Sequence, residues 1–523
     1  ADFINGKNSF DFLAEFGLGI LDNATVRTAA TVTRSGIRQS QPTGYFLRLH
    51  DLASSEKEDV YRDLISGEES DVKRRFEVPL EEFADIPGHT ICYSTPSEVR
   101  ELHNSDLKLD AEQANIDGES VGMARQGVAT ADNDRFLRFH WESSALNEFK
   151  PIASGGSNAW VAPRIAETVE WGKDGERIKR SSPTIRTPNE SLYGKEGLTW
   201  TRVKKTGRRF GFYPGGLFSD TGYLFVPKEG DSPWALMSVV NSTLYHALFL
   251  SLSTERNWNS GDVGRIPWFE TFEENRELGE KAKRQYEIMV ETYHSDPTSP
   301  YYVGPEILPS ETLDEFFHDH PHTSEVINGI STNYGRSDPS ESITTLSREA
   351  EQRKLSRTGE LLEKFQRINT LVYDELGIPD QTRQEILDEV FLRTLEGPED
   401  RKIPDPDSIP EVPENLDEQV KDLVHHFAME AVRDEDDGIV PIHGVDNQPN
   451  MLDRIVERFE DAYGEHAEDR LVEVDGILGA ESAAEEAYPN LRGFIEDDLF
   501  DYHVSRMENT PIVWKLTTER LLA

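Results

Sequence analysis

Apolar and polar positions follow three different patterns along this 523-residue chain. Residues 10–105 alternate short apolar or β-branched stretches with turn residues, which is typical of strands. Residues 106–270 are rich in Gly, Pro, Trp and Tyr, which indicates an irregular α/β module with many loops. From residue 271 onward, apolar residues recur three and four positions apart, which predicts helices. The strands predicted in the first region are 25–33, 45–52 and 89–94.

Two further segments complete this organisation. The apolar run 234–252 approaches the length that crosses a bilayer, but the polar residues within Asn241–His246 interrupt it, so we expect one buried core helix. The Pro- and acid-rich residues 396–418 have the composition of a linker. The expected fold class is therefore α/β and α+β multidomain, with mostly helical C-terminal regions. The expected domains are 1–105, 106–270, 271–395, the linker 396–418, and 419–523.

The composition is strongly acidic, with a formal charge of −43 and a pI near 4.7. Because Trp, Phe, Leu and Val recur at core-like spacing, we interpret the chain as a folded protein suited to concentrated salt, as in a salt-loving microbe, and not as a disordered one. The single cysteine, Cys92, excludes an intramolecular disulfide and a cysteine-built zinc site, and its apolar neighbours predict a buried thiol. No signal peptide opens the chain, so we expect a soluble, cytoplasmic protein.

One stretch departs from the acidic background. Residues 151–228 hold 13 Lys or Arg against 7 Asp or Glu, and aromatic residues interleave with them. A basic stretch in such a chain indicates a polyanionic partner such as nucleic acid, whose phosphates Lys and Arg bind. The alternative is a basic internal interface that faces an acidic domain of the same chain. The candidate DNA-binding residues here are Arg177, Lys179, Arg180, Trp200, Lys204, Lys205, Arg208 and Arg209.

Two other patterns leave alternatives open. The "DND" turn places Asn133 and Arg135 where they could reach base edges, or where Asp and Asn side chains only cap the loop. His318, His320 and His322 alternate around an aspartate, which allows a metal site, although Pro321 favours an exposed loop. The neighbouring pair His425 and His426 is expected at the surface or at the edge of the core. We expect no metal-ligating residues in this chain.

The segment "FGLG" at Phe16–Gly19 has the form of a glycine loop that binds S-adenosylmethionine. Such a loop needs a strand before it and a helix after it. The residues before Phe16 are polar and not strand-like, and a strand is predicted after Gly19, so we do not assign a cofactor site. The chain also lacks the Asn-Pro-Pro-Tyr motif with which adenine methyltransferases hold a flipped base. We therefore expect neither catalytic nor cofactor-binding residues in this chain.

Five blocks resemble, in the same order, segments of PglX, the adenine-specific DNA methyltransferase family of BREX phage-defence systems, which has type IIG restriction–modification relatives. The first is "GVATADNDRFLRFHWE", and the third is "YGKEGLTWTRVKKTGRRFGFYPGGLFSDTG". The five blocks are 127–142, 160–180, 193–222, 235–267 and 368–378.

The resemblance implies that this chain is only the C-terminal part of such an enzyme. Residues 1–105 would be the last strands of a Rossmann-like methyltransferase sheet, with "FGLG" as a turn, and 106–270 would be the target-recognition domain. S-adenosylmethionine and the catalytic motif would belong to a missing upstream half, which becomes an expected partner together with double-stranded DNA and other BREX proteins. Whether this chain is itself an enzyme stays open. The alternative is a split or decayed product that binds DNA or partner proteins without methyltransferase activity.

Overall fold

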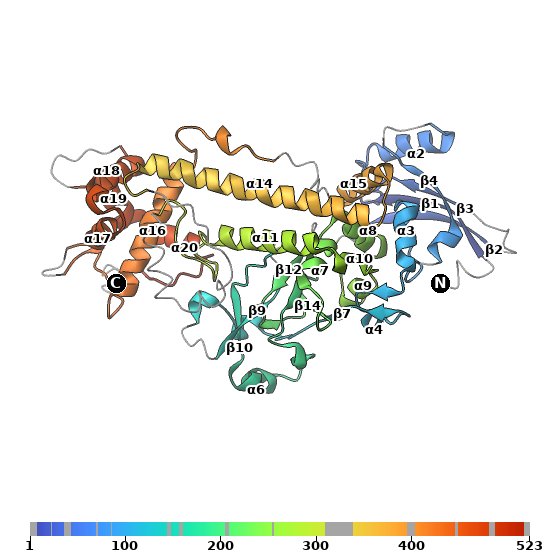
Figure 1. The fold of residues 1–523 in the computed structure, drawn as a ribbon, viewed down its shortest axis with the longest axis horizontal. Coiled ribbons are helices and arrows are strands. Elements are labelled where there is room, and N and C mark those ends of the chain that lie inside the picture. Colours follow the sequence, from blue (N-terminus) through green and yellow to red (C-terminus); the bar gives the residue numbers. More distant parts are fainter. Residues whose placement is uncertain are drawn as a thin grey trace.

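Small sheets followed by long helices make up the computed structural model (Figure 1). The described residues are 8–21, 24–35, 43–68, 72–84, 86–143, 148–155, 160–203, 209–253, 256–308, 338–394, 403–444, 448–480 and 487–516. Sheets come first and helices dominate after residue 271, so the mixed α/β class with helical C-terminal regions is confirmed.

The N-terminal sheet has the strand order β2-β1-β3-β4. Strand β1 pairs antiparallel with β2 and parallel with β3, and β3 pairs antiparallel with β4. Helix α2 (Lys57–Ser66) packs its buried Leu64 against Ala14, Leu47 and Leu49 on one face of this sheet. The strands are β1 (Asn8–Gly17), β2 (Thr28–Ser35), β3 (Thr43–Arg48) and β4 (Arg75–Pro79).

The central sheet is antiparallel, in the order β12-β11-β14-β7. Its strands β11, β12 and β14 are almost entirely buried. Three helices pack against the sheet: α7 (Pro233–Val240), α8 (Thr243–Leu252) and α11 (Arg276–Tyr293). The largest apolar core of the described chain lies here. The strands are β7 (Gly122–Arg125), β11 (Gly197–Thr201), β12 (Phe210–Tyr213) and β14 (Gly222–Pro227).

A third sheet, in the order β13-β9-β10-β8, carries helices α5 (Asn133–Phe136) and α6 (Gly172–Ser181). In Figure 1 this part projects downward from the body of the molecule, with α6 at its tip. It has a small core of its own, which includes Phe136, Trp171 and Ile178. The strands are β8 (Leu137–Phe139), β9 (Phe149–Ala153), β10 (Glu167–Glu170) and β13 (Leu217–Phe218).

Helix α14 (Ile343–Glu375) connects the two ends of the molecule (Figure 1). Its 33 residues span about 50 Å at 1.5 Å per residue. Its C-terminal half, with Ile368 and Val372, joins the central core, whereas Ile343 and Leu346 at its start join a second core of C-terminal helices. The remaining long helices are α15 (Asp380–Thr394), α16 (Leu416–Asp434), α17 (Met451–Tyr463), α18 (Ala467–Leu478) and α20 (Leu499–Arg506).

Three local predictions need correction. Residues 89–94 form no strand: they run through turns while Cys92 and Tyr93 fill the core with their side chains. The residues before Phe16, predicted not to be a strand, form β1. The run 234–252 is two helices, α7 and α8, bent by 70°, because the Asn241 side chain bonds the backbone of Phe210 and Ser242 caps the second helix.

No single helix in the described ranges is long and apolar enough to cross a membrane. The bent pair α7 and α8 meets that test only when both helices are counted together. Every side chain of α8, and those of residues 235–240 in α7, are buried inside the protein.

Candidate nucleic-acid interface

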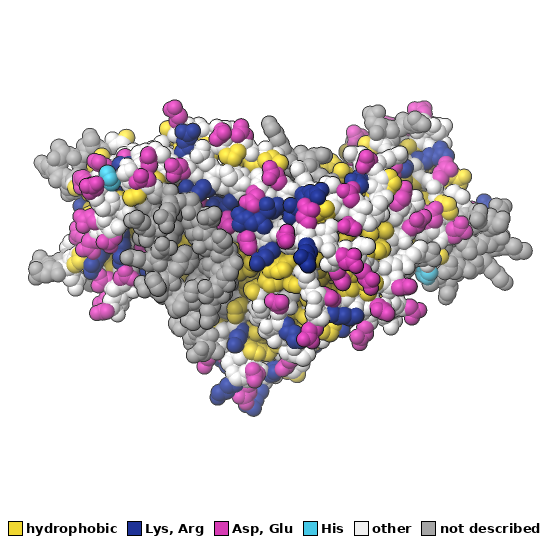
Figure 2. Space-filling model, viewed as in Figure 1, with side chains coloured by type: hydrophobic (Ala, Val, Ile, Leu, Met, Phe, Trp, Pro, Cys, Tyr) yellow, Lys and Arg dark blue, Asp and Glu magenta, His cyan; other side chains and the backbone are white. Residues whose placement is uncertain are grey.

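The projecting part, which we call the α6 module, comprises the described residues of 127–193 together with β13. One apolar core joins α5, α6 and the segment that contains Ile185 and Tyr193. The module's sequence has nine Lys or Arg and nine Asp or Glu, so its formal charge is zero in a chain of −43. Figure 2 shows cationic and anionic side chains interleaved at its tip, at the bottom of the view.

The start of α6 is a left-handed turn and not regular helix. Lys173, Asp174 and Gly175 have φ values of 50°, 54° and 73°. A Cβ at Gly175 would lie 2.8 Å from the ring of the buried Trp171, so the turn needs glycine at this position. Left-handed backbone at a lysine and an aspartate is strained, and such strain tends to occur at functional sites. The turn presents both of these side chains to solvent.

Each predicted cation of α6 has a carboxylate partner. Arg177 Nη1 donates to both carboxylate oxygens of Glu170, at 2.7 and 2.8 Å. Lys179 Nζ donates to Glu190 at 2.8 Å, and Arg180 pairs with the preceding turn of its own helix at Glu176. The side chains of Arg177 and Arg180 are 66% and 77% exposed. Their partners differ, because the Glu176 side chain is 43% exposed and that of Glu170 is 14% exposed. An exposed pair such as Arg180–Glu176 contributes about 0–1 kcal/mol, so a phosphate can replace that carboxylate at little cost.

Three further cations were missed as individual sites. Lys173, Arg186 and Lys195 are exposed, and none forms an ion pair with another residue in the part of the chain described above. Arg186 is held close to the "DND" turn, because its backbone exchanges hydrogen bonds with Ala129. All three belong to the basic stretch 151–228, so the sequence did contain a signal for them. They were not singled out because they have fewer basic neighbours in the sequence than the predicted cations.

The "DND" turn is capped by its own side chains. Asp132 accepts a hydrogen bond from the backbone N–H of Arg135 at 3.3 Å, and Asn133 Oδ1 accepts one from the Thr130 hydroxyl. The guanidinium of Arg135 lies 5.0 Å from the centre of the Phe136 ring and is exposed. Loop capping is therefore observed for the two acceptors, while Arg135 keeps a free surface beside α6 on the same core.

Trp200 and Arg209 are corrections. Their side chains lie in the central core and not on the α6 module, with residue exposures of 1% and 3%. Trp200 Nε1 donates to the carbonyl of Trp258 at 3.1 Å, and the Arg209 guanidinium lies 3.9 Å from the centre of that residue's ring. Side chains without exposed surface cannot stack on a base or meet a phosphate, so we leave both out of the interface. Lys204, Lys205 and Arg208 lie outside the described residues.

The histidine predictions have a mixed outcome. His425 and His426 are buried, contrary to expectation, because α16 turns them toward the second core. His425 Nε2 lies 2.9 Å from His503 Nδ1, and His426 Nδ1 lies 3.1 Å from the Tyr302 hydroxyl. The cluster at 318–322 falls outside the described residues. Within the described ranges, no group of three or more His, Cys, Asp or Glu could hold a metal. Cys92 is buried, as predicted, and this burial raises the pKa of its thiol to about 11.

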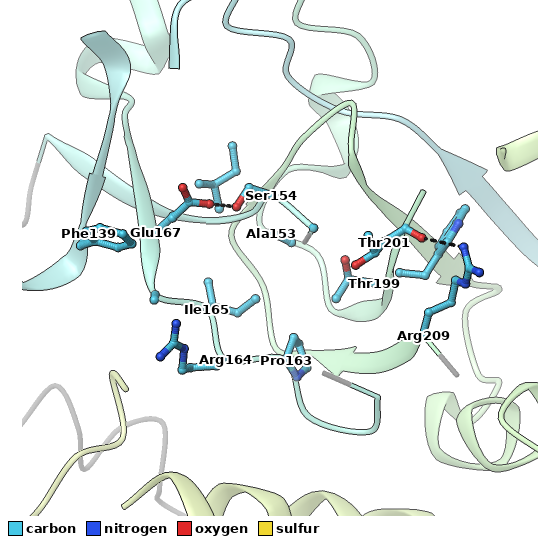
Figure 3. A pocket seen from close by; sticks show the side chains of 14 residues that line it. Phe139, Ala153, Ser154, Pro163, Arg164, Ile165, Glu167, Thr199, Thr201 and Arg209 are labelled. Atoms are coloured by element: carbon cyan, nitrogen blue, oxygen red, sulfur yellow. Dashed lines mark hydrogen bonds between the residues drawn. The ribbon is translucent and has the colours of Figure 1, made fainter. Parts of the chain in front are cut away.

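A small pocket of about 120 Å³ marks the junction between the α6 module and the central sheet (Figure 3). On one side the Ser154 hydroxyl donates to Glu167, and burial together with the charge of Glu508 raises the pKa of that carboxyl. On the other side Arg209 donates to the carbonyl of Thr201 at 3.4 Å. This volume is well below that of ordinary ligand sites, so we treat the pocket as a seam between two packed units.

No protein-family model matches the chain. Over 234 residues it is 27% identical to a protein of Escherichia coli O9:H4 (strain HS) named adenine-specific methyltransferase BrxX. The match covers 42% of this chain but 18% of that protein, so the chain spans a minor part of its relative's length. This similarity, like the resemblance of the five sequence blocks, is to an adenine-specific methyltransferase.

Proposed function

We propose that this chain is the DNA-recognition portion of a SAM-dependent, N6-adenine-specific DNA methyltransferase that marks host DNA in phage defence, as in PglX-like enzymes of BREX systems. The observation that carries the proposal is the α6 module, which is uncharged overall and rich in exposed cations within a chain of −43. The similarity to an adenine-specific methyltransferase supplies the reaction class.

Recognition would divide between two kinds of contact. Exposed cations at the tip, Lys173, Arg177 and Arg180, would meet phosphates and fix the orientation of the duplex without reading its sequence. Arg135 would read base edges, because a guanidinium matches the two acceptors of guanine in the major groove. The glutamate partners of α6 would hold the cations in place until phosphate replaces them.

The N-terminal sheet supports the proposed link to an upstream catalytic half. Strand β2 stands at the edge of the sheet, with β1 as its partner. Val32 on β2 is 54% exposed, and Val26 just before it is 53% exposed. Proteins normally cover or blunt such apolar sheet edges. In our proposal, the methyltransferase sheet of the upstream half continues from β2, and S-adenosylmethionine and the flipped adenine bind in that half.

The test measures binding of the full chain to a 30-base-pair DNA duplex (roughly three helical turns) by fluorescence anisotropy at a series of KCl concentrations. The test variant carries Arg177→Glu and Arg180→Glu. The matched control carries Arg62→Glu and Lys73→Glu, whose side chains are 72% and 61% exposed and also paired with glutamates.

Counterion release predicts a slope of log affinity against log salt of about 0.9 per phosphate contact. The test variant should therefore lose about 1.8 from the slope, and the control should match the unmodified chain. Equal slopes for both variants, or no binding at any salt that keeps the chain folded, would overturn the assignment of the module. Binding without adenine methylation after an upstream half is supplied would favour the non-enzymatic alternative.

A further inference from the structure

The chain turns back after α20, and the segment that follows, residues 507–513, contacts both this helix and the α6 module. We call this segment the C-terminal strap. Glu508 and Asn509 have φ values of 52° and 63°, so the turn is left-handed. The N–H of Asn509 donates to the carbonyl of Val504 on α20 at 2.9 Å, which holds the turn against the helix.

The strap holds the α6 module through two side chains of the module. Trp141 Nε1 donates to the carbonyl of Thr510 at 3.1 Å, and Arg164 Nη2 donates to Glu508 at 2.6 Å. Arg164 Nη1 also donates to the hydroxyl of Thr298, in the segment that follows α11. Arg164 lines the small pocket at the junction with the central sheet (Figure 3). One guanidinium therefore joins the module to the strap and to the end of a long helix.

A buried histidine holds the strap on its other side. Nε2 of His503, on α20, accepts hydrogen bonds from the N–H groups of Ile512 and Val513, each at 3.2 Å. A ring nitrogen that accepts carries no proton, so the proton of the neutral ring is on Nδ1. This Nδ1 lies 2.9 Å from His425 Nε2 on α16. Burial lowers the pKa of His503 to about 4, so at neutral pH the ring links α16, α20 and the strap.

Apolar packing does not supply this connection. The module has a core of its own, and a small cluster that includes Ala153, Tyr213 and Leu224 joins it to the central sheet. In the part of the chain that the structure describes, no apolar cluster contains both a residue of the module and a residue of α16, α17, α18 or α20. The strap is therefore a polar brace between two units that share no core.

We infer that the strap fixes the orientation of the α6 module about its junction with the central sheet, and that His503 is the positioning residue of the strap. Release of the strap on either side leaves the module folded, because its core is separate, but lets it move as a unit. The consequence for DNA rests on the proposed function. Since only one orientation presents the cations of α6 to the duplex, a module that samples several orientations binds with an affinity reduced by the competent fraction.

Double electron–electron resonance between two spin labels measures the orientation directly. In the full chain, the labels are attached at Asp134→Cys on α5 and Val472→Cys on α18, which are both exposed positions. Cys92, the single native cysteine, is buried and is not labelled under native conditions. The width of the distance distribution between the labels reports how firmly the module is held.

The test variant Trp141→Phe/Glu508→Ala removes the N–H donor and the carboxylate that join the strap to the module. The matched control Glu58→Ala/Trp514→Phe makes the same kinds of change at side chains that are exposed and outside these contacts. On the other side of the strap, His503→Leu removes the acceptor of the two backbone N–H groups. His503→Gln supplies an amide oxygen in its place and is the conservative rescue.

The distribution should be narrow in the unmodified chain, the control and His503→Gln, and broad in the test variant and His503→Leu. Equal widths in the unmodified chain and the test variant would overturn the inference, and this comparison decides also where His503→Leu does not fold. In the anisotropy assay with duplex DNA, the test variant should bind about fivefold more weakly, as expected when about one orientation in five is competent.

The salt slope separates this inference from the proposed function. The slope should stay unchanged in the test variant, because the number of phosphate contacts stays the same. A reduced slope or an unchanged affinity would overturn the link between the strap and DNA binding. A broad distribution in the test variant, together with no DNA binding by the unmodified chain, would support the strap and overturn the proposed function alone.

Discussion

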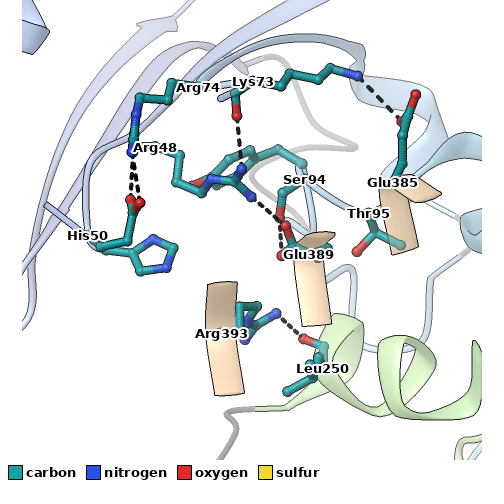
Figure 4. Close-up of polar contacts among 12 residues, drawn as sticks. Arg48, His50, Lys73, Arg74, Ser94, Thr95, Leu250, Glu385, Glu389 and Arg393 are labelled. Carbon is teal, nitrogen blue, oxygen red and sulfur yellow. Dashed lines mark hydrogen bonds and ion pairs between the residues drawn. The ribbon is translucent and has the colours of Figure 1, made fainter. Parts of the chain in front are cut away.

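Arg48 and Glu389 form an ion pair between the N-terminal sheet and helix α15. Among the described ion pairs that join this sheet to a helix, it is the most deeply buried. The two side chains are 4% and 6% exposed. The Ser94 hydroxyl donates to the second oxygen of Glu389 at 2.7 Å, and Arg48 Nη2 donates to the carbonyl of Lys73 at 2.8 Å. The pair therefore sits at the end of β3, against α15, and both of its members make a further hydrogen bond (Figure 4).

Glu389→Ala should be strongly destabilising, because it leaves the Arg48 guanidinium buried without its carboxylate. Removal of one partner from a buried pair costs about 3–5 kcal/mol. One turn earlier on α15, Glu385 pairs with Lys73 at 3.5 Å, but these side chains are 37% and 61% exposed. Such a pair is worth about 0–1 kcal/mol, so Glu385→Ala is the matched control.

Urea unfolding followed by tryptophan fluorescence measures the difference, with the free energy taken by linear extrapolation for the transition that exposes the central core. The Glu389→Ala loss should persist in 1 M KCl, where the Debye length is about 3 Å, while the small control effect should vanish. The double variant Arg48→Met/Glu389→Met should recover much of the loss, since apolar replacement removes both buried charges. Equal losses for the two alanine variants, or no recovery in the double variant, would refute the reasoning.

Two further predictions concern histidines and glycines. Burial, with repulsion between the rings, lowers the pKa of His425 to about 3, and burial lowers that of His503 to about 4. Since both lie below the ordinary 6.5, stability should fall as pH drops from 6.5 toward 4, and the difference between the urea midpoints at pH 7.5 and pH 5 should be smaller for His425→Gln than for the unmodified chain. An equal difference in the two proteins would contradict this. Gly17 has φ +69°, and an added Cβ would lie 2.8 Å from the His50 backbone, whereas Gly67 has φ +91° and open space. Gly17→Ala should therefore lower the melting temperature more than Gly67→Ala, and equal shifts would show that backbone strain alone decides.

Helices and charge could be predicted from the sequence, because both depend on local pattern. The helical region after residue 271 follows from apolar spacing, and the basic stretch that contains α6 follows from counting. Strand β1 was predicted wrongly although its apolar residues Phe10, Phe12, Ala14 and Phe16 recur at the two-residue period of a strand. It becomes a strand through pairing with β2 and β3, a long-range arrangement that no local pattern contains. Residues 89–94 show the converse: they are apolar enough for a strand but have no ladder partner.

The burial of Trp200 and Arg209 could have been predicted from the apolar runs in which they lie or which they adjoin. β11 and β12 read "GLTWT" and "FGFY", nearly continuous apolar runs that are typical of strands covered on both faces. The basic residues beside these runs in the chain drew both side chains into the predicted interface. In the structure, Trp200 lies within β11 and Arg209 immediately precedes β12, and both side chains are buried at the central core, while the cations of α6 stand on a separate small sheet.

Two classes of ion pair divide the roles of charge in this protein. At α6, the exposed Arg177 and Arg180 pair with Glu170 and Glu176, whose side chains are 14% and 43% exposed. Because an exposed pair such as Arg180–Glu176 is worth about 0–1 kcal/mol, its exchange for a phosphate is nearly free and depends on salt. The Arg48–Glu389 pair cannot be exchanged, since opening it strands a buried charge. Salt should therefore tune the proposed binding of DNA over a range in which the junction between sheet and helix stays intact.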